Sequence, residues 1–386
     1  METTFTYKKN INLLFAVLIL IGIAALIAGF MSDTQRTWNN ILLNNYYFIT
    51  ISIGALLFYS LQYITNSGWS ALIQRIPMAL GAFLPLGALL MLLMYFGLPQ
   101  VYEWAQPGIT ETDKLIAHKE PFLNVPFFMI RLVIYFVLFL SVAWVLRKYA
   151  KLEDQSANLN YHNKSRYYAQ VFIFIAAIFF SFASKDWIMT IDSHWYSTLF
   201  GFRNMVLSMY YGSAAIILLL LFLRSQGYFE KVNEAHFHDL ARYLFRFSIV
   251  FGYLWFMQFL ITWYANIPEL TVYYYPRFIG DWQPMFYAEL FINFAIPFVV
   301  MMSDDLGKKP KVLLGISVLL MLGLWISIFV QIMPGAYGPM KFGFIEIGIW
   351  LGYAGLFLGV TFMALAKSQL VPTNHPYLEE SIHHHL

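Results

Sequence analysis

Residues 184–204 read SKDWIMTIDSHWYSTLFGFRN, a polar and aromatic stretch that lies between two long apolar segments. At helical spacing its apolar side chains share one face, and the opposite face carries Asp186, Thr190, Ser193 and Ser197. This pattern predicts a short helix at a membrane surface, with Trp187, Trp195 and Tyr196 at headgroup depth. Asp192 projects beside the apolar stripe, so we expect it to have a partner. A second interpretation is a loop helix that only covers the end of a helical bundle.

The composition of the whole chain is that of a polytopic membrane protein. Of its 386 residues, 60% are hydrophobic and only 12% are charged, which excludes a soluble globular domain. The net charge is +3, and the basic residues are spread over loops. This distribution indicates how the protein is oriented in the membrane; a nucleic-acid-binding surface would need a basic patch. The chain has no cysteine, which excludes Cys-ligated iron–sulfur clusters, thiol catalysis and disulfides within it.

Apolar segments long enough to cross a bilayer recur along the chain and predict an all-α fold. We expect about ten transmembrane helices within a single membrane domain, residues 1–386. The predicted spans are 11–30, 44–64, 76–97, 125–146, 167–184, 202–224, 243–264, 284–303, 311–332 and 345–366.

Lys and Arg are more numerous in the termini and alternate loops on one side, chiefly 147–166, 224–242 and 303–311, than in the loops on the other. By the positive-inside rule, both termini are predicted to be cytoplasmic, which gives a multi-pass protein of a bacterial inner membrane. The longer loops on the other side face the periplasm in a Gram-negative cell: 98–124, 185–201 and 265–283.

Several charges lie within or beside the predicted spans, where an unpaired charge costs a few kcal/mol or more. Most gather in the outer third, and a smaller group lies near the inner surface. We therefore expect ion pairs, with Arg131, Arg203 and Arg246 as the basic partners. Glu346 lies at the same outer level.

Glu289 and Asn293 lie one helical turn apart on the eighth span and face the same way. With Asp304 and Asp305 at the other end of that helix, they indicate a polar stripe across the bilayer. Such a stripe conducts protons or holds neighbouring helices together. The candidates for a proton path are Asp186, Asp192, His194, Glu269, Glu289, Asn293, Asp304 and Asp305.

The sequence indicates no catalytic residue, metal site or bound cofactor in this chain. All histidines fall outside the predicted spans, which argues against haem. His236 and His238, with Asp239, have a weak metal-ligand spacing, and a solvated loop is the simpler interpretation. No phosphate-binding loop, metalloprotease helix or nucleophile elbow is present. Quinone contact with the aromatic and acidic residues of 186–196 stays open, because an interfacial belt has the same composition.

Two segments carry a family resemblance: DWIMTIDSHWYST at 186–198 and WYANIPELT at 263–271. With ten spans, they resemble the NrfD/PsrC-like (polysulfide-reductase-type) integral membrane subunits of bacterial alternative complex III, a quinol:cytochrome c oxidoreductase. The resemblance covers residues 10–366. The chain departs from the pattern at Ser193, where many relatives have proline, and at Leu270, where an acidic residue is common.

The resemblance implies a fold and a set of partners. The short termini and the lack of a membrane-embedded histidine resemble the ActF subunit, with two four-helix bundles (helices 2–5 and 6–9) and flanking helices 1 and 10. It implies that quinol oxidation belongs to the paralogous NrfD-like membrane subunit, ActC, and that this chain supplies scaffolding and a proton path. The implied partners are that paralogue, a periplasmic iron–sulfur subunit, multihaem and monohaem cytochrome c subunits, a terminal oxidase and lipid, with haem c and iron–sulfur clusters held by partners. The residues that match the motifs are Asp186, Asp192, His194, Trp263, Tyr264, Asn266 and Glu269.

Three functions are therefore open. The first is a membrane subunit of a respiratory quinol:electron-acceptor oxidoreductase that takes part in proton translocation. The second is a purely structural anchor for periplasmic redox subunits. The third is a secondary transporter, which is disfavoured because the charges gather toward one surface and not at mid-membrane.

Overall fold

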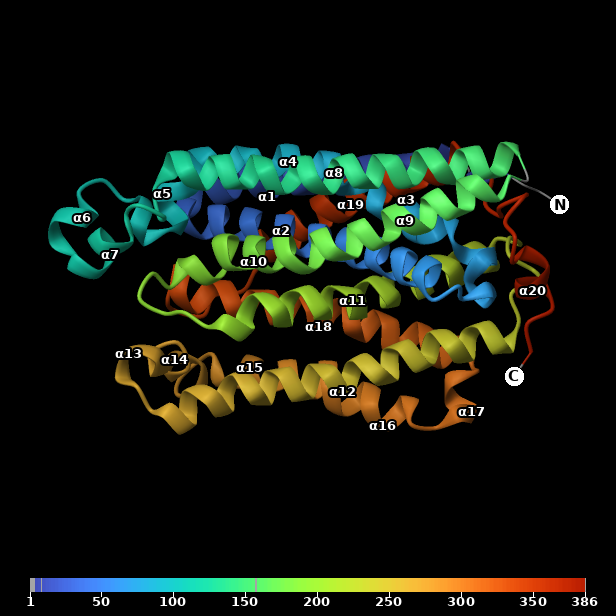
Figure 1. The fold of residues 1–386 in the computed structure, drawn as a ribbon. Coiled ribbons are helices and arrows are strands. Elements are labelled where there is room, and N and C mark those ends of the chain that lie inside the picture. The colour runs from blue at the N-terminus through green and yellow to red at the C-terminus, as the bar shows by residue number, and fades with distance from the viewer. Residues whose placement is uncertain (1–3, 8, 157, 386) are drawn as a thin grey trace.

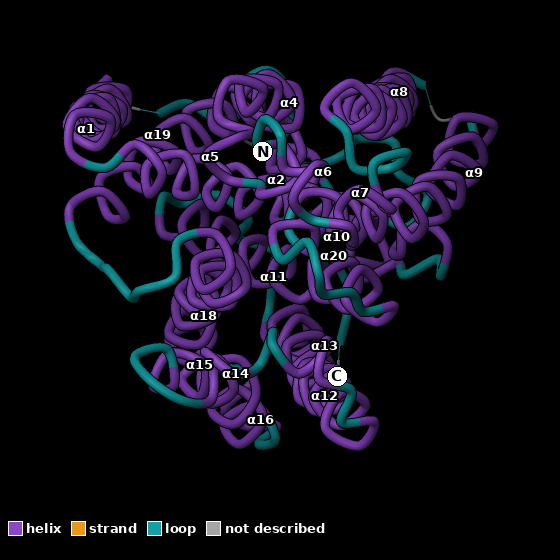
Figure 2. Tube along the Cα trace, turned by 90° about the vertical axis from the view of Figure 1, so that its left-hand side faces the viewer, coloured by secondary structure: helices purple, strands orange, loops and turns teal. Residues whose placement is uncertain are grey.

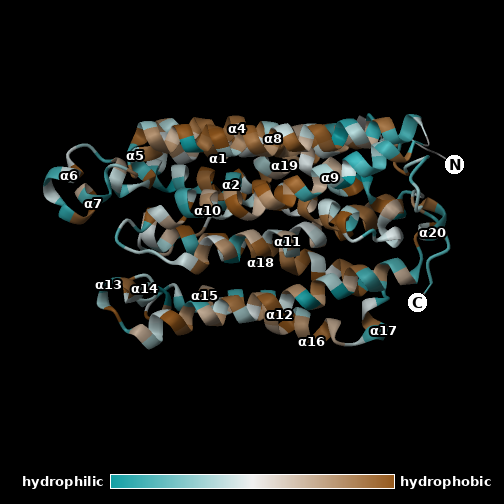
Figure 3. Ribbon diagram, viewed as in Figure 1, coloured by the Kyte–Doolittle hydropathy of each residue, from teal (hydrophilic) through white to brown (hydrophobic). Residues whose placement is uncertain are grey.

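The computed structural model describes residues 4–7, 9–156 and 158–385. The chain is 82% helical, and the described residues form no β-strand. Within the described residues, ten helices are long and apolar enough to cross a membrane, so the all-α, multi-pass prediction is confirmed. In lipid the backbone must satisfy its own hydrogen bonds, which is why apolar segments of this length fold as helices. Figure 3 shows the apolar residues along the helices and the polar ones mainly at their two ends.

The first five spans include two irregular ones. The third span is broken at Pro85 and Pro99, each of which starts a new short helix. The fifth contains a turn of π-helix at Ala176–Phe180. The elements are α1 (Lys9–Ser32), α2 (Thr34–Ile64), α3 (Arg75–Leu80), η2 (Gly81–Phe83), α4 (Leu84–Leu92), η3 (Leu93–Gly97), α5 (Leu98–Val101), α8 (Val125–Gln155), α9 (Leu159–Ile175) and α10 (Ser181–Trp187).

The last five spans include one more π-helical turn, at Phe291–Ala295 in the eighth span. The elements are α11 (Thr198–Ser225), α12 (Glu234–Ala265), α15 (Gln283–Leu290), α16 (Ile296–Met301), α18 (Pro310–Ala336) and α19 (Phe344–Ala366). The short helices between spans are η1 (Gly68–Ile73), η4 (Glu103–Ala105), α6 (Ile109–Thr112), α7 (Lys114–Lys119), η6 (Met189–Ile191), α13 (Pro268–Thr271), α14 (Tyr275–Phe278), α17 (Asp304–Gly307) and α20 (Leu378–Ile382).

The spans pack as two closed groups of four. In the first group α2, α4, α8 and α9 contact one another in order, and α9 returns to α2. In the second group α11, α12, α15–α16 and α18 do the same, and α18 returns to α11. The groups meet where α2 contacts α11 and α18, and the paired helices α1 and α19 lie on the outside against α2 and α3 (Figure 2). Glycines allow the closest crossings: a Cβ on Gly22 would lie 2.4 Å from the Cα of Gly352.

The central helix α2 begins ten residues earlier than the predicted span 44–64. This helix carries Asn39, Asn40 and Asn44, and all three are fully buried against other helices. The apolar stretch of α2 is entirely buried within the protein, so other helices and not lipid surround it. A helix solvated by protein tolerates polar side chains that lipid would reject.

The surface helix predicted for 184–204 is wrong. The fifth span continues to Trp187, one 3₁₀ turn follows, and the chain is irregular from Asp192 until α11 begins at Thr198. Trp187 and Trp195 are buried within the protein and do not lie at its surface. The ring of Trp195 stacks on Tyr273 with 3.9 Å between centroids. Contacts between the loops of the two bundles therefore override the local amphipathic pattern.

Both ends of the chain lie at the same end of the bundle, which we call the terminal end (Figure 1). The short helices α6, α7, α13 and α14 lie at the opposite end, which we call the loop end. This arrangement agrees with the predicted even number of spans. The assignment of the terminal end to the cytoplasm stays a prediction from the distribution of Lys and Arg.

Candidate functional site: buried ion pairs toward the loop end

Arg203 on α11 and Glu289 on α15 form a buried ion pair in the second bundle. Arg203 Nη2 lies 2.6 Å from Glu289 Oε1, and their side chains are 5% and 3% exposed. The hydroxyl of Ser327 on α18 donates to the same carboxylate oxygen at 2.7 Å. The side-chain amide of Gln331 in turn donates to Ser327 Oγ at 3.1 Å. Removing either charge would leave the other buried and unpaired, which costs several kcal/mol.

Asn293 extends this network toward the middle of the bundle. Its amide donates to the carbonyl of Glu289 at 2.9 Å, so the two residues share a face as the sequence predicts. Tyr211 donates to Asn293 Oδ1 at 3.1 Å, and Tyr210 donates to its backbone carbonyl at 3.0 Å. The π-helical turn at Phe291–Ala295 alters the backbone pairing here, and side chains satisfy the carbonyls it leaves free.

A small cavity of about 20 Å³ adjoins the ion pair. Its volume suits a single water molecule and its lining is partly polar, as a buried hydration site requires. The side-chain carbonyl oxygens of Gln258 and Gln331 have no partner within the described part of the chain. The lining residues are Arg203, Trp255, Gln258, Tyr273, Tyr274, Phe286, Glu289, Val330 and Gln331.

Arg277, from α14, reaches the same network from the loop end. Its guanidinium donates to the carbonyls of Val330 at 3.0 Å and Gln331 at 3.2 Å, and it lies over the ring of Tyr273 at 3.5 Å. Arg277 Nη2 is 3.8 Å from Asp192 Oδ2, so Asp192 has the partner that the sequence predicts. Burial raises the pKa of Asp192, and Arg277 opposes that shift. The sequence gives Arg277 no role beyond a loop charge.

The first bundle holds a comparable pair. Arg131 Nε on α8 lies 2.7 Å from Asp186 Oδ2 on α10, and both side chains are buried. Tyr135 donates to the same oxygen at 2.7 Å. The guanidinium also lies over the ring of Phe122 at 3.9 Å, which gives the cation a second contact.

Glu346 at the start of α19 is held by Arg36 of α2 through two hydrogen bonds of 2.8 and 2.5 Å. Asn40 donates to Glu346 Oε1 at 2.9 Å. The expectation that deep charges pair is therefore met at Arg131, Arg203 and Glu346. The predicted spans place Arg36 in a loop, but the structure places it in the first turn of α2.

The remaining sequence candidates lie apart from this network. His194 is partly exposed and pairs with Asp113 at 2.9 Å, and Glu269 is exposed on α13. Asp304 is exposed and lies 3.1 Å from His238. Asp305 and Arg246 are exposed and form no ion pair with described residues, so the ion pair predicted for Arg246 is wrong: its charge is not enclosed by the protein and needs no buried partner. Residues 294–302, FAIPFVVMM, are apolar, so α16 carries no continuous polar stripe from Asn293 to Asp304.

His236 and His238 do not lie in a solvated loop. Both are buried in the first turns of α12, and His236 closes a capping box with Asn233. His238 points to Asp304 and His236 to Ser381, so their rings serve different contacts. A buried group that the sequence did not indicate, Glu153, His162 and His375, lies at the terminal end. No sequence motif indicates this group, because His375 is more than 200 residues from the other two.

Comparison with known proteins gives no match: no family model fits the chain, and no curated protein is significantly similar to it. The functional argument therefore depends on the residues themselves.

Proposed function

We propose that the chain is an integral membrane subunit of a respiratory complex that passes electrons from quinol to cytochrome c or to an oxidase. In this proposal quinol is oxidised in a paralogous membrane subunit, and the present chain supports assembly and carries protons. The two motifs at 186–198 and 263–271 support the assignment. The periplasmic iron–sulfur and cytochrome c subunits would then dock at the loop end.

The observation that carries the proton-conducting role is one connected set of polar contacts. It runs from Asp192 through Arg277 to Gln331, and from there through Ser327 to the Arg203–Glu289 pair. Glu289 is a buried carboxyl group beside a water-sized cavity, and ionisable groups within a membrane commonly mark proton paths. Moving one charge across the membrane is worth about 2.3 kcal/mol per 100 mV, so such a group can couple to the membrane potential.

The test is Glu289→Gln, which keeps a hydrogen bond to Arg203 and removes the titratable group. The intact complex is reconstituted in vesicles, and protons released per electron are measured during quinol oxidation. We expect fewer protons per electron while the subunits still co-purify. The control is Glu111→Gln, an exposed acid at the loop end. An unchanged proton yield would exclude conduction through Glu289.

A second candidate is a structural anchor, and one observation favours it. Glu289, Asp186 and Glu346 are each held by an arginine and further hydrogen bonds, an arrangement suited to fixing helices. For an anchor, Glu289→Gln would leave the proton yield unchanged while weakening assembly. Purification in mild detergent distinguishes both from a transporter, because c-type haem and iron–sulfur protein should then accompany the chain.

A further inference from the structure

The segment after α19 crosses the terminal end of the bundle (Figure 1). We call residues 367–385 the strap. It contains one short helix, α20, and otherwise has no regular structure. Ser381 fastens it to the loop before α3: its hydroxyl donates to the carbonyl of Trp69 at 2.5 Å and accepts from the amide of Leu72 at 3.2 Å. Thr373 and Asn374 donate to the carbonyl of Asp154 at 3.0 and 2.8 Å.

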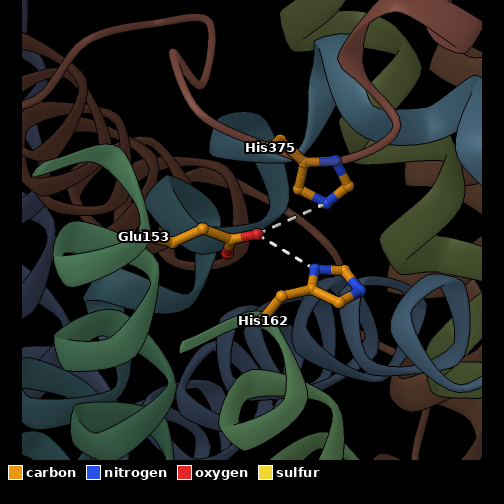
Figure 4. Close-up of side chains that lie close together, drawn as sticks. All are labelled: Glu153, His162 and His375. Carbon is orange, nitrogen blue, oxygen red and sulfur yellow. Dashed lines mark hydrogen bonds and ion pairs between the residues drawn. The ribbon is translucent and has the colours of Figure 1, made fainter. Parts of the chain in front are cut away.

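Two histidines of the strap face carboxylates of the bundle: the partly exposed His384 lies 2.7 Å from Asp239 of α12, and the buried His375 faces Glu153. Figure 4 shows Glu153 of α8 between the rings of His162 and His375. Glu153 Oε1 lies 2.9 Å from His162 Nδ1 and 4.0 Å from His375 Nε2. Tyr63 of α2 donates to the other carboxylate oxygen at 3.0 Å. Glu153, His162, His375 and Tyr63 are all buried.

The backbone decides which nitrogen of His375 carries the proton. The amide of Tyr377 donates to His375 Nδ1 at 3.2 Å, so that nitrogen is an unprotonated acceptor. Nε2 therefore holds the hydrogen; it lies 4.0 Å from Glu153 Oε1 and 3.0 Å from the side-chain amide nitrogen of Gln74. The amide orientation that places the oxygen of Gln74 on this side satisfies that donor. A metal ion would need the lone pair of Nε2, so the contacts favour a hydrogen-bonded cluster over a metal site.

Burial lowers the pKa of His375, and His162 and Arg75 act in the same direction, whereas Glu153 raises it. Arg75 is committed to a salt bridge with Asp154, and no Lys or Arg of the described residues lies within ion-pair distance of Glu153. The other titratable groups facing the site are Tyr59 and Tyr63 of α2 and Tyr377 of the strap. A proton added to His375 must go to Nδ1, where it would oppose the N–H of Tyr377.

We propose that His375 is a proton-operated latch: the strap docks across the terminal end while His375 is neutral, and protonation of His375 releases it. The proposal does not depend on the respiratory assignment. Release would open a cavity of about 380 Å³ that the strap walls on one side. The strap contributes Val371, Pro372, Thr373, Leu378 and Ile382 to it, opposite residues 227–232 and Leu72.

The direction of the pH effect follows from burial, which lowers the pKa of docked His375 from 6.5 to about 4. The released strap takes up the proton first, so docking is strongest above pH 6.5 and weakens as the pH falls toward 4. Over that window the ratio of released to docked strap should rise about tenfold per pH unit. Below the docked pKa the ratio should become constant.

The chain has no cysteine, so two spin labels can be placed without background. Glu379→Cys on the strap and Lys311→Cys at the start of α18 are both exposed positions. Double electron–electron resonance of the full chain in lipid nanodiscs then gives the distribution of distances between the two spin labels from pH 8 to pH 4. We expect a single narrow distance at high pH and a growing longer population below pH 6.5. An unchanged distribution down to pH 4 would overturn the proposal.

Two substitutions test the assignment to His375. His375→Gln keeps a donor at this position and cannot titrate, so its distance distribution should not respond to pH. His383→Gln is the matched control, since His383 is an exposed histidine of the same strap, and it should respond as the unmodified chain does. A wild-type pH response in His375→Gln would assign the effect to another group. If EDTA releases the strap at pH 8 and Zn²⁺ restores it, a bound metal ion holds the strap and the proposal is wrong.

Discussion

The guanidinium of Arg277 donates to the backbone carbonyl of Gln331 at 3.2 Å. This contact connects the Arg277–Asp192 pair with the Arg203–Glu289 pair. The side-chain amide of Gln331 donates in the other direction, to Ser327, which itself donates to Glu289. A loop residue is thereby connected to a carboxylate inside the bundle. Each link can be removed separately, which makes the network testable by substitution.

Ser327→Ala removes one donor from the buried carboxylate of Glu289. A hydrogen bond to a charged group contributes about 1.5–3 kcal/mol, so the free energy of unfolding should fall by that amount. Denaturant titration in detergent micelles measures it. Ser141→Ala is the control, because Ser141 is exposed and donates only to the carbonyl of Leu138. Equal losses in the two variants would show that the Ser327 contact contributes nothing.

Arg203→Met leaves Glu289 buried without a cation, and we expect a loss of about 3–5 kcal/mol in unfolding free energy. Adding Glu289→Gln to the same chain should recover most of that loss, because the uncompensated charge is gone. Calorimetry of the two single variants and the double variant gives the coupling energy. Additive effects would mean that the pair is not coupled. Arg242→Met, at an exposed position, serves as control.

Gly54→Ala should destabilise the crossing of α2 and α11. A Cβ at Gly54 would lie 1.8 Å from the carbonyl oxygen of Ser208, so the helices must separate, at a cost of about 1–3 kcal/mol. Gly315→Ala is the matched control on α18, where no atom lies within 4 Å of the new methyl group. The thermal midpoint of the purified protein should fall for the first variant only. A similar midpoint for both would contradict the close crossing.

His238→Gln should move the titration of Asp304. The hydrogen bond from His238 is the largest cause that lowers the pKa of Asp304, which lies between two spans. Without the imidazole of His238 the pKa of Asp304 should rise toward its usual value of 3.8. The interaction stabilises the chain above that pH and is lost as the pH falls through the lowered pKa. Carboxyl ¹³C chemical shifts follow the change, and an unaltered midpoint would show that the two side chains do not interact in solution.

Hydropathy predicted the number and approximate position of the spans, because lipid-facing helices such as α1 are apolar on nearly every side. The energetic cost of isolated charges predicted that Arg131 and Arg203 would be paired, but not with which acids. The partners come from other helices, and sequence spacing carries no information on them. Asp186 and Glu289 were candidates for a proton path, and Glu289 also for holding neighbouring helices together; the structure places both against these arginines.

The failures have a common physical cause. The segment at 184–204 has the periodicity of a surface helix, but Trp195 stacks on Tyr273 of a distant loop and the helix stops. Arg277 lies in a loop in the sequence and is almost wholly buried in the fold. His375 gains its role only when the strap returns to α8 and α9. In each case a contact between remote segments outweighs the local pattern.

The burial of α2 has a consequence for how the protein is made. The helix carries asparagines that a bilayer would reject, and it contacts α11 and α18, which are synthesised much later. A newly made α2 is apolar enough to cross the membrane, but its asparagines lack their protein neighbours there, whereas the apolar α1 carries no such burden. Biogenesis must shelter α2, in the insertion machinery or beside early neighbours, until the second bundle arrives to enclose it.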